Sequence, residues 1–241
     1  MNLPNILTIL RVISVPFFVY LLLQPELISR VIAFVLFVFA SVTDLIDGYL
    51  ARKWKQETEL GKFLDPLADK FLVLGAFLTF FGMSSQVKLW MVLCIVGRDM
   101  LITVMRWLAI HKGTSLRTSV FGKIKTSFQM FAIGTILLSF TLITYKQRGA
   151  INEMYSSATE QGVATYAVAA ANYERFMNGQ IEGLFFGLAT FVPYYLMLFT
   201  VIVTLISGLR YIVTNYALFS YPVTVLRERS EKRAEEKPKF D

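Results

Sequence analysis

The sequence predicts an all-α polytopic membrane protein: a bundle of six transmembrane helices with a polar, metal-binding chamber on its cytoplasmic side. Of its 241 residues, 55% are hydrophobic, and the mean hydropathy is +0.55, whereas a soluble domain is about 45–50% apolar. Six apolar runs each approach the ~20 residues that cross a bilayer as a helix. Charged residues lie inside or beside several of these runs, which predicts an enclosed polar chamber.

The apolar runs define the predicted helices in order. The first lacks a basic start and a small-residue cleavage site, so we expect a retained helix and not a signal peptide. The last follows a long, more polar segment. The six predicted spans cover residues 6–23, 27–50, 63–82, 87–110, 119–143 and 184–212.

Basic residues orient the bundle. They gather between the second and third runs, between the fourth and fifth, and after the sixth, whereas Arg30 is the basic residue nearest the first opposite loop and residues 81–86 carry no charge. Because Lys and Arg concentrate in cytoplasmic loops, both termini and the acidic motif described below are predicted to be cytoplasmic, at a membrane of the bacterial inner type. The basic residues are Arg52, Lys53, Lys55 and Lys62; Lys112, Arg117, Lys123 and Lys125; and Arg227, Arg229, Lys232, Arg233, Lys237 and Lys239.

Two segments fall outside the predicted spans. Residues 145–183 are too polar to cross a membrane and rich in alanine, so we expect a partly helical insertion on the outer surface, within a membrane domain of residues 1–225. Residues 226–241 mix both signs of charge and form a predicted cytoplasmic tail. The net charge of +7 matches anionic lipid better than nucleic acid, because no basic stripe with exposed aromatic residues occurs.

Four aspartates stand in two closely spaced pairs at the ends of the second and third predicted helices. Asp44 and Asp47 are three residues apart, so they share one helix face. Asp65 and Asp69, four apart, do the same on the next helix. Such carboxylates are costly at a membrane edge without positive partners. Their eight oxygens predict a site for hard divalent cations such as Mg2+ or Mn2+.

A set of cations lies in the fourth and fifth predicted spans. Arg98 is deep within the fourth, so it either pairs with an acid such as Asp99 or a motif aspartate, or binds an anionic substrate. Arg106, seven residues after Asp99, shares its face. Lys123 and Lys125 open the fifth span, where they either anchor it at the membrane surface or contribute with the arginines to binding a phosphate, which needs several donors.

The acidic motif resembles the signature of the CDP-alcohol phosphatidyltransferase family. The string D-x-x-D-G-x-x-A-R, then eight residues, then G-x-x-x-D-x-x-x-D is matched at every defined position. NLPNILTILR at residues 2–11, GKFLDPLADK at 61–70 and GKIKT at 122–126 resemble the phosphatidylglycerophosphate synthase branch most closely. The matched positions of the signature are Asp44, Asp47, Gly48, Ala51, Arg52, Gly61, Asp65 and Asp69.

The resemblance implies a reaction and a role for each residue. A phosphatidyl group would pass from CDP-diacylglycerol to sn-glycerol 3-phosphate, giving phosphatidylglycerol phosphate and CMP in phospholipid biosynthesis. Asp44, Asp47, Asp65 and Asp69 would hold two ions of Mg2+ or Mn2+, and Asp69 would also be the catalytic base. The donor's CDP group would be bound by Asn5, Thr8, Gly48, Ala51, Arg52 and Gly61.

Other interpretations remain open at this point. Asn5 and Thr8 equally suit helix capping, and Arg52 could extend its charge to the membrane surface. Arg98, Arg106, Lys123 and Lys125 favour a phosphorylated acceptor such as glycerol 3-phosphate, with inositol phosphate and phosphatidylglycerol as alternatives. An ion or proton transporter would place its charges near the midplane and show repeated halves, which the sequence lacks. The family resemblance further implies a homodimer among membrane lipids.

Overall fold

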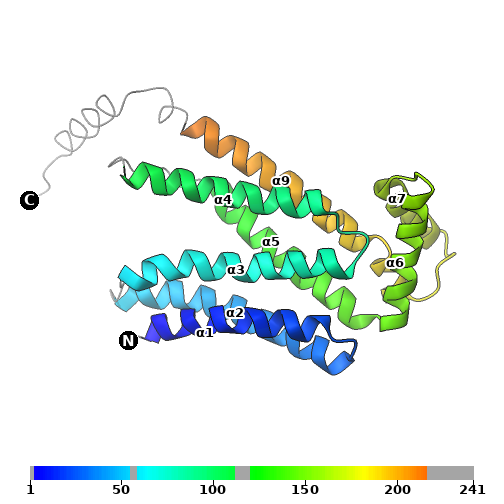
Figure 1. Cartoon of the computed structure of the whole chain (residues 1–241), viewed down its shortest axis with the longest axis horizontal. Coiled ribbons are helices and arrows are strands. Elements are labelled where there is room, and N and C mark those ends of the chain that lie inside the picture. Colours follow the sequence, from blue (N-terminus) through cyan, green and yellow to red (C-terminus); the bar gives the residue numbers. More distant parts are fainter. Residues whose placement is uncertain (1–2, 55–58, 112–119, 216–241) are drawn as a thin grey trace, which may run out of the picture. The chain divides into compact units, whose positions relative to one another are not determined.

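Helices make up the regular structure of the described part of the chain, which confirms the all-α class. The computed structural model describes residues 3–54, 59–111 and 120–215, and no strand occurs in these ranges (Figure 1). The predicted tail, 226–241, lies outside them. The helices are α1 Leu3–Leu23, α2 Leu27–Trp54, α3 Glu59–Met83, α4 Leu89–His111, α5 Val120–Leu142, α6 Tyr145–Glu160, α7 Thr165–Met177, α8 Leu184–Ala189 and α9 Val192–Thr214.

Contacts divide the chain into two compact units. The first comprises Met1–Val92 and Phe128–Phe199, and the second comprises Leu93–Ser127 and Thr200–Asp241. Among the described residues, α1–α5 and α9 contain 21 to 28 residues each. Of the described segments, Ile124–Leu142 and Leu184–Thr214 are long and apolar enough to cross a membrane.

The first unit is held together by close helix packing. Helix α1 contacts both α2 and α3. At Gly75 of α3, an added Cβ would lie 3.1 Å from Val15 Cγ1 and 3.3 Å from Val19 Cγ2, so the absence of a side chain lets α1 approach closely. Arg30 of α2 is buried and donates hydrogen bonds to the carbonyls of Phe140 and Ile143 at the end of α5, 2.6 and 2.8 Å away. These bonds satisfy carbonyls that the helix end leaves without partners.

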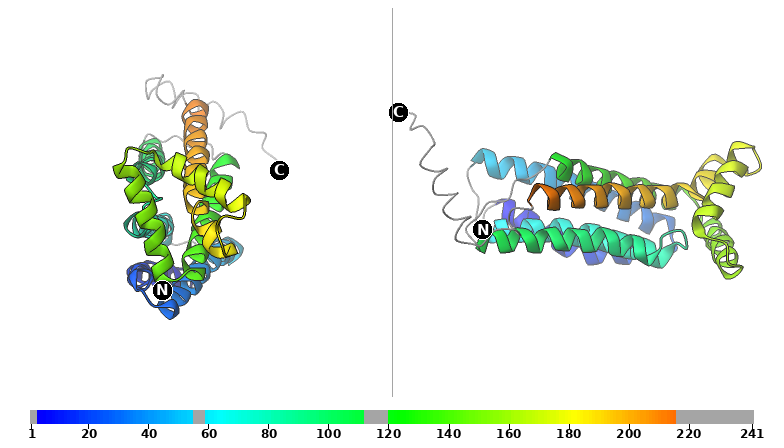
Figure 2. Two further views of the ribbon diagram at one scale, coloured as in Figure 1. Left: turned by 90° about the vertical axis from the view of Figure 1, so that its right-hand side faces the viewer. Right: turned by 90° about the horizontal axis from the view of Figure 1, so that it is seen from above.

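Helices α6 and α7 occupy the segment predicted to be a partly helical insertion. Helix α6 lies crosswise to α3 (Figure 2) and begins with a capping box in which Thr144 and Gln147 bond each other's backbone N–H groups. The buried Tyr155 hydroxyl donates to the carbonyl of Thr190, 2.6 Å away, and burial raises the pKa of this phenol above its usual value. Asn152 binds the turn after α3, donating to the Met83 carbonyl at 2.8 Å.

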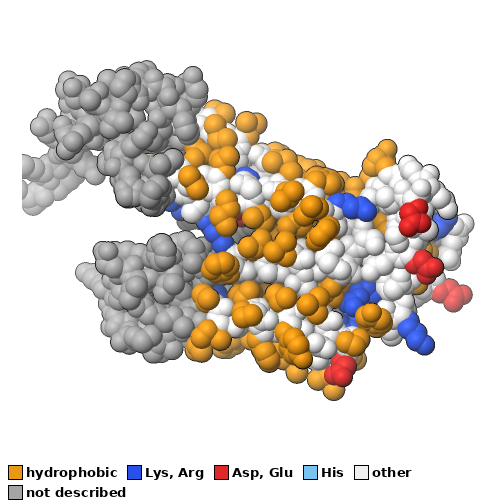
Figure 3. All heavy atoms as spheres, viewed as in Figure 1, with side chains coloured by type: hydrophobic (Ala, Val, Ile, Leu, Met, Phe, Trp, Pro, Cys, Tyr) orange, Lys and Arg blue, Asp and Glu red, His pale blue; other side chains and the backbone are white. Residues whose placement is uncertain are grey.

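Surface chemistry differs between the long helices and the α6–α7 segment. Hydrophobic side chains are spread over the displayed face of the long helices, whereas most acidic side chains on that face gather around α6 and α7 (Figure 3). Exposed apolar residues on the long helices include Ile28, Phe39, Leu93, Phe131 and Leu209. A surface of this kind suits lipid and not water.

The sixth predicted span, 184–212, is two helices in the structure. Helix α8 ends at Ala189 and α9 begins at Val192. The Thr190 hydroxyl donates back to the Gly187 carbonyl at 2.6 Å, and Pro193 stands in the first turn of α9, where its missing N–H costs no helical hydrogen bond. The apolar pattern continues across this break, which explains why the sequence predicts a single span.

Candidate active site

The structure places both halves of the acidic motif on helices. The first half lies near the end of α2, and the second lies in the first turns of α3. On a helix, the spacings of three and four residues put the members of each aspartate pair on one face. The motif side chains lie outside the described set, as do those of Asn5 and Thr8 of α1. The motif residues concerned are Asp44, Asp47, Gly48, Ala51, Arg52, Gly61, Asp65 and Asp69.

The donor groups in this motif fit a divalent metal ion. Carboxylate oxygens are the preferred ligands of Mg2+ and are accepted by Mn2+, and the helical backbone of α2 and α3 sets the spacing within each pair. Among the side chains that the structure describes, no three His, Cys, Asp or Glu residues gather to hold a metal ion. The four motif aspartates are outside that set, so the metal assignment rests on their chemistry and spacing.

A compact charged cluster forms in the second unit between α4 and α5. The Lys125 ammonium donates to both carboxylate oxygens of Asp99, at 2.6 Å to Oδ1 and 2.5 Å to Oδ2. Arg98 Nη1 donates to the same Oδ1 at 3.1 Å. One carboxylate therefore bonds two cations, so the cluster of Arg98, Asp99 and Lys125 carries a net positive charge.

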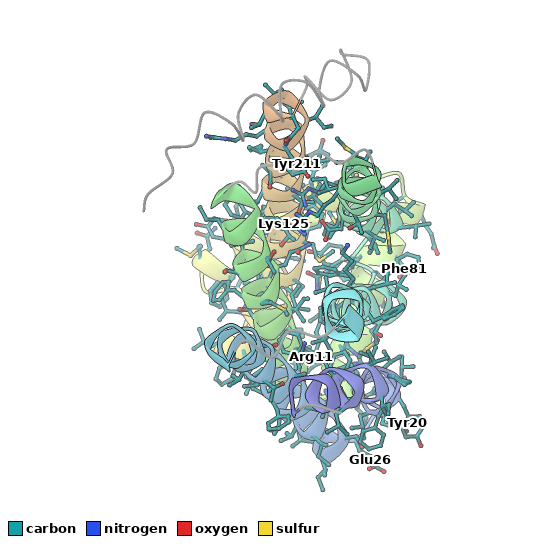
Figure 4. The ribbon with its side chains drawn as sticks, turned by 90° about the vertical axis from the view of Figure 1, so that its left-hand side faces the viewer. Arg11, Tyr20, Glu26, Phe81, Lys125 and Tyr211 are labelled. Carbon is teal, nitrogen blue, oxygen red and sulfur yellow. The ribbon has the colours of Figure 1, made fainter. Side chains whose placement is uncertain are left out.

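This charged cluster is largely withdrawn from solvent. The side chains of Arg98 and Asp99 are 13% and 16% exposed, and that of Lys125 is 5% exposed. Electrostatic interactions strengthen in such a setting because water screens them less. Cations in this setting bind an anion such as a phosphate strongly. Figure 4 shows Lys125 on the side of α5 that faces α4 and α9.

Helix α9 adds two contacts to the charged cluster that sequence reasoning missed. Arg98 Nη2 donates to the Ser207 hydroxyl at 2.8 Å, and the stem of Arg98 lies against Gly208. Ser207 belongs to a buried polar face of this otherwise apolar helix. The members of that face are Thr200, Thr204, Ser207 and Tyr211, and the buried Asn215 follows just after the helix ends, all spaced by three or four residues. That spacing was the signal in the sequence that could have identified this face.

The remaining predicted acceptor residues do not join the charged cluster in the described contacts. Arg106 lies two turns farther along α4 and its side chain is exposed. The sequence placed Asp99 and Arg106 on one face with Arg98 to the side, yet the described contacts join Arg98 directly to Asp99. The side chain of Lys123 lies outside the described set.

Comparison with known proteins shows which proteins this chain is similar to. The family model described as CDP-alcohol phosphatidyltransferase matches residues 1–168. A protein of Haemophilus influenzae is 39% identical over 162 residues, which is 65% of this chain and 85% of the relative. Proteins of Pectobacterium atrosepticum and Escherichia coli K12 are each 39% identical over 142 residues, 56% of this chain and 76% of each relative. All three are named CDP-diacylglycerol–glycerol-3-phosphate 3-phosphatidyltransferase.

Proposed function

Because this chain belongs to the CDP-alcohol phosphatidyltransferase family, we propose that it transfers a phosphatidyl group from CDP-diacylglycerol to sn-glycerol 3-phosphate. The products are phosphatidylglycerol phosphate and CMP, so the protein is a transferase of phospholipid biosynthesis. The complete acidic motif at residues 44–69 supports the reaction type. Relatives named for this reaction, at 39% identity, support the acceptor.

In the proposed reaction, a free hydroxyl of glycerol 3-phosphate attacks the lipid-side phosphorus of the donor. A new P–O bond forms to the acceptor, the P–O bond to CMP breaks, and CMP leaves with the electron pair. Asp69 takes the hydroxyl proton as general base. A carboxylate is a weak base, so Asp69 requires hydrogen-bond contact with a well-aligned hydroxyl.

The other motif residues bind and orient the donor in this proposal. Gly48, Ala51 and Gly61 leave room for the nucleotide beside the helices, and Arg52 contacts a phosphate. Asn5 and Thr8 of α1 contribute to the nucleotide site. Asp44, Asp47 and Asp65, together with Asp69, would hold two Mg2+ or Mn2+ ions, which would neutralise pyrophosphate charge.

The charged cluster supports a phosphorylated acceptor. It places two cations, Arg98 and Lys125, beside the single carboxylate of Asp99, and a phosphate needs several such donors. Arg106 and Lys123 extend the positive charge along α4 and α5. A neutral or cationic alcohol would gain nothing from this arrangement.

The membrane arrangement follows from the same elements. We propose that α1–α5 and α9 are the six spans, because each has at least 21 residues and ~20 cross a bilayer. The basic loops then place both termini and the active site on the cytoplasmic side, with α6 and α7 on the opposite side. A homodimer embedded in membrane lipid is the proposed assembly.

An acceptor panel tests this function. Purified protein with CDP-diacylglycerol and Mg2+ or Mn2+ is offered glycerol 3-phosphate, inositol phosphate, phosphatidylglycerol, glycerol and serine separately, and CMP release is followed. We expect rapid release with glycerol 3-phosphate because its phosphate pairs with the cations of the charged cluster. Release with only inositol phosphate or only phosphatidylglycerol would show that the acceptor is not glycerol 3-phosphate. The absence of release with every one of these acceptors would contradict the proposed enzymatic activity.

A further inference from the structure

Helix α9 contacts the charged cluster through two adjacent residues that have no role in the proposed reaction itself. We infer that Ser207 and Gly208 are positioning residues: they hold the Arg98 guanidinium where it receives the acceptor's phosphate. This inference rests on the proposed function. It adds a determinant of acceptor affinity from a helix that lies beyond the 168 residues matched by the family model.

Ser207 fixes one end of the guanidinium. Its hydroxyl accepts a hydrogen bond from Arg98 Nη2 at 2.8 Å, while Nη1 bonds Asp99 at 3.1 Å. Ser207 is buried, at 1% exposure, so its hydroxyl is shielded from competing water. An arginine side chain has many rotamers, and two bonds to different helices restrict Arg98 to one of them.

Gly208 provides the space that this rotamer occupies. A Cβ built on Gly208 would lie 2.9 Å from Arg98 Cγ, 3.3 Å from Nε and 3.7 Å from Cδ. The first distance is shorter than carbon atoms tolerate without displacement. Any side chain at residue 208 would therefore push the stem of Arg98 away from α9.

The Nε atom of Arg98 shows that, among the described contacts, packing against Gly208, and not a hydrogen bond, holds the stem of this side chain in place. This atom is buried and has no hydrogen-bond partner among the described residues, so no bond from Nε holds the stem. The stem is confined by Gly208 at one side, and the guanidinium by Asp99 and Ser207 at its two Nη groups. A small displacement would break the 2.8 Å bond and misdirect the charge.

The first test removes the Ser207 hydroxyl. For Ser207→Ala, the KM for glycerol 3-phosphate should rise about tenfold, the size expected for a lost hydrogen bond to a charged group, with kcat and the KM for CDP-diacylglycerol within about twofold. Ser207→Thr keeps a hydroxyl and should restore most of the affinity. Thr204→Val is the matched control, because the Thr204 hydroxyl is also buried on α9 but has no hydrogen-bond partner among the described residues.

The second test fills the space at Gly208. Gly208→Ala should raise the KM for glycerol 3-phosphate by at least as much as Ser207→Ala. Gly97→Ala is the matched control: Gly97 precedes Arg98 on α4, and an added Cβ there meets nothing within 4 Å. Gly97→Ala should leave both KM values unchanged. Thermal unfolding of each purified variant shows whether it is folded, and either substitution alone decides the question if the other does not fold.

The outcomes separate this inference from the proposed function. An unchanged KM for glycerol 3-phosphate in folded Ser207→Ala or Gly208→Ala would overturn the positioning role. Equal losses for both substrates, or the same loss in Thr204→Val and Gly97→Ala, would overturn it as well, since they indicate a general structural effect. If the wild-type protein releases no CMP with glycerol 3-phosphate, the proposed function itself fails.

Discussion

Asp69→Asn is expected to abolish phosphatidyl transfer while CDP-diacylglycerol still binds. The amide keeps the size of the carboxylate but cannot accept the acceptor's proton, and general base catalysis contributes roughly 10²–10⁴-fold. Asp69 lies on α3, four residues after Asp65, so the backbone that carries the pair is unchanged. CMP release measures transfer, and equilibrium binding of CDP-diacylglycerol measures the donor site.

Glu59→Gln provides the control for this substitution. Glu59 is the first residue of α3 and is not part of the acidic motif. Its substitution removes one negative charge, as Asp69→Asn does. The Glu59→Gln variant should retain near wild-type CMP release. Full activity in Asp69→Asn would remove Asp69 from the mechanism, and loss of donor binding would contradict the expectation that the donor still binds without this carboxylate.

Lys125→Met is expected to remove the preference for a phosphorylated acceptor. Without the ammonium, the charged cluster keeps the pair of Asp99 and Arg98 and loses one of its two cations. A hydrogen bond to a charged group contributes about 1.5–3 kcal/mol, so kcat/KM for glycerol 3-phosphate should fall roughly 10- to 100-fold. The much lower rate with unphosphorylated glycerol should change little, because glycerol has no charge to pair with Lys125.

The fold should survive this substitution, and a second lysine provides the comparison. Asp99 keeps Arg98 as its partner, so no buried carboxylate is left without a cation, the situation that costs most. Lys88→Met removes a half-buried lysine outside the charged cluster and should leave acceptor selectivity intact. An unchanged ratio of glycerol 3-phosphate to glycerol activity in Lys125→Met would exclude Lys125 from the acceptor site.

Local sequence patterns predicted the helices well but not their interruptions. The predicted run 119–143 corresponds to α5 at Val120–Leu142, and 6–23 corresponds to α1 at Leu3–Leu23. Apolar length determines such segments directly. The break at Thr190 was missed because it depends on a side-chain bond to Gly187, and the hydropathy on both sides is alike.

Contacts between distant segments were beyond what the sequence could predict. Arg98 and Ser207 are 109 residues apart, and Arg30 and Phe140 are 110 apart. Charge and burial indicated that Arg98 needs a partner, and Asp99 was one of the alternatives left open. The spacing of polar residues on α9 could have identified the face that includes Ser207, but nothing in the sequence indicated that this face contacts Arg98. The structure shows the hydrogen bond of Ser207 with Arg98.

Identification of the products tests the central claim most directly. Purified protein is incubated with CDP-diacylglycerol, isotopically labelled glycerol 3-phosphate and Mg2+ or Mn2+, and CMP and the lipid fraction are both quantified by mass spectrometry. The proposed function predicts equimolar CMP and labelled phosphatidylglycerol phosphate, and neither product once a chelator removes the metal ions. CMP without labelled lipid would indicate hydrolysis of the donor, and that result would contradict transfer to glycerol 3-phosphate.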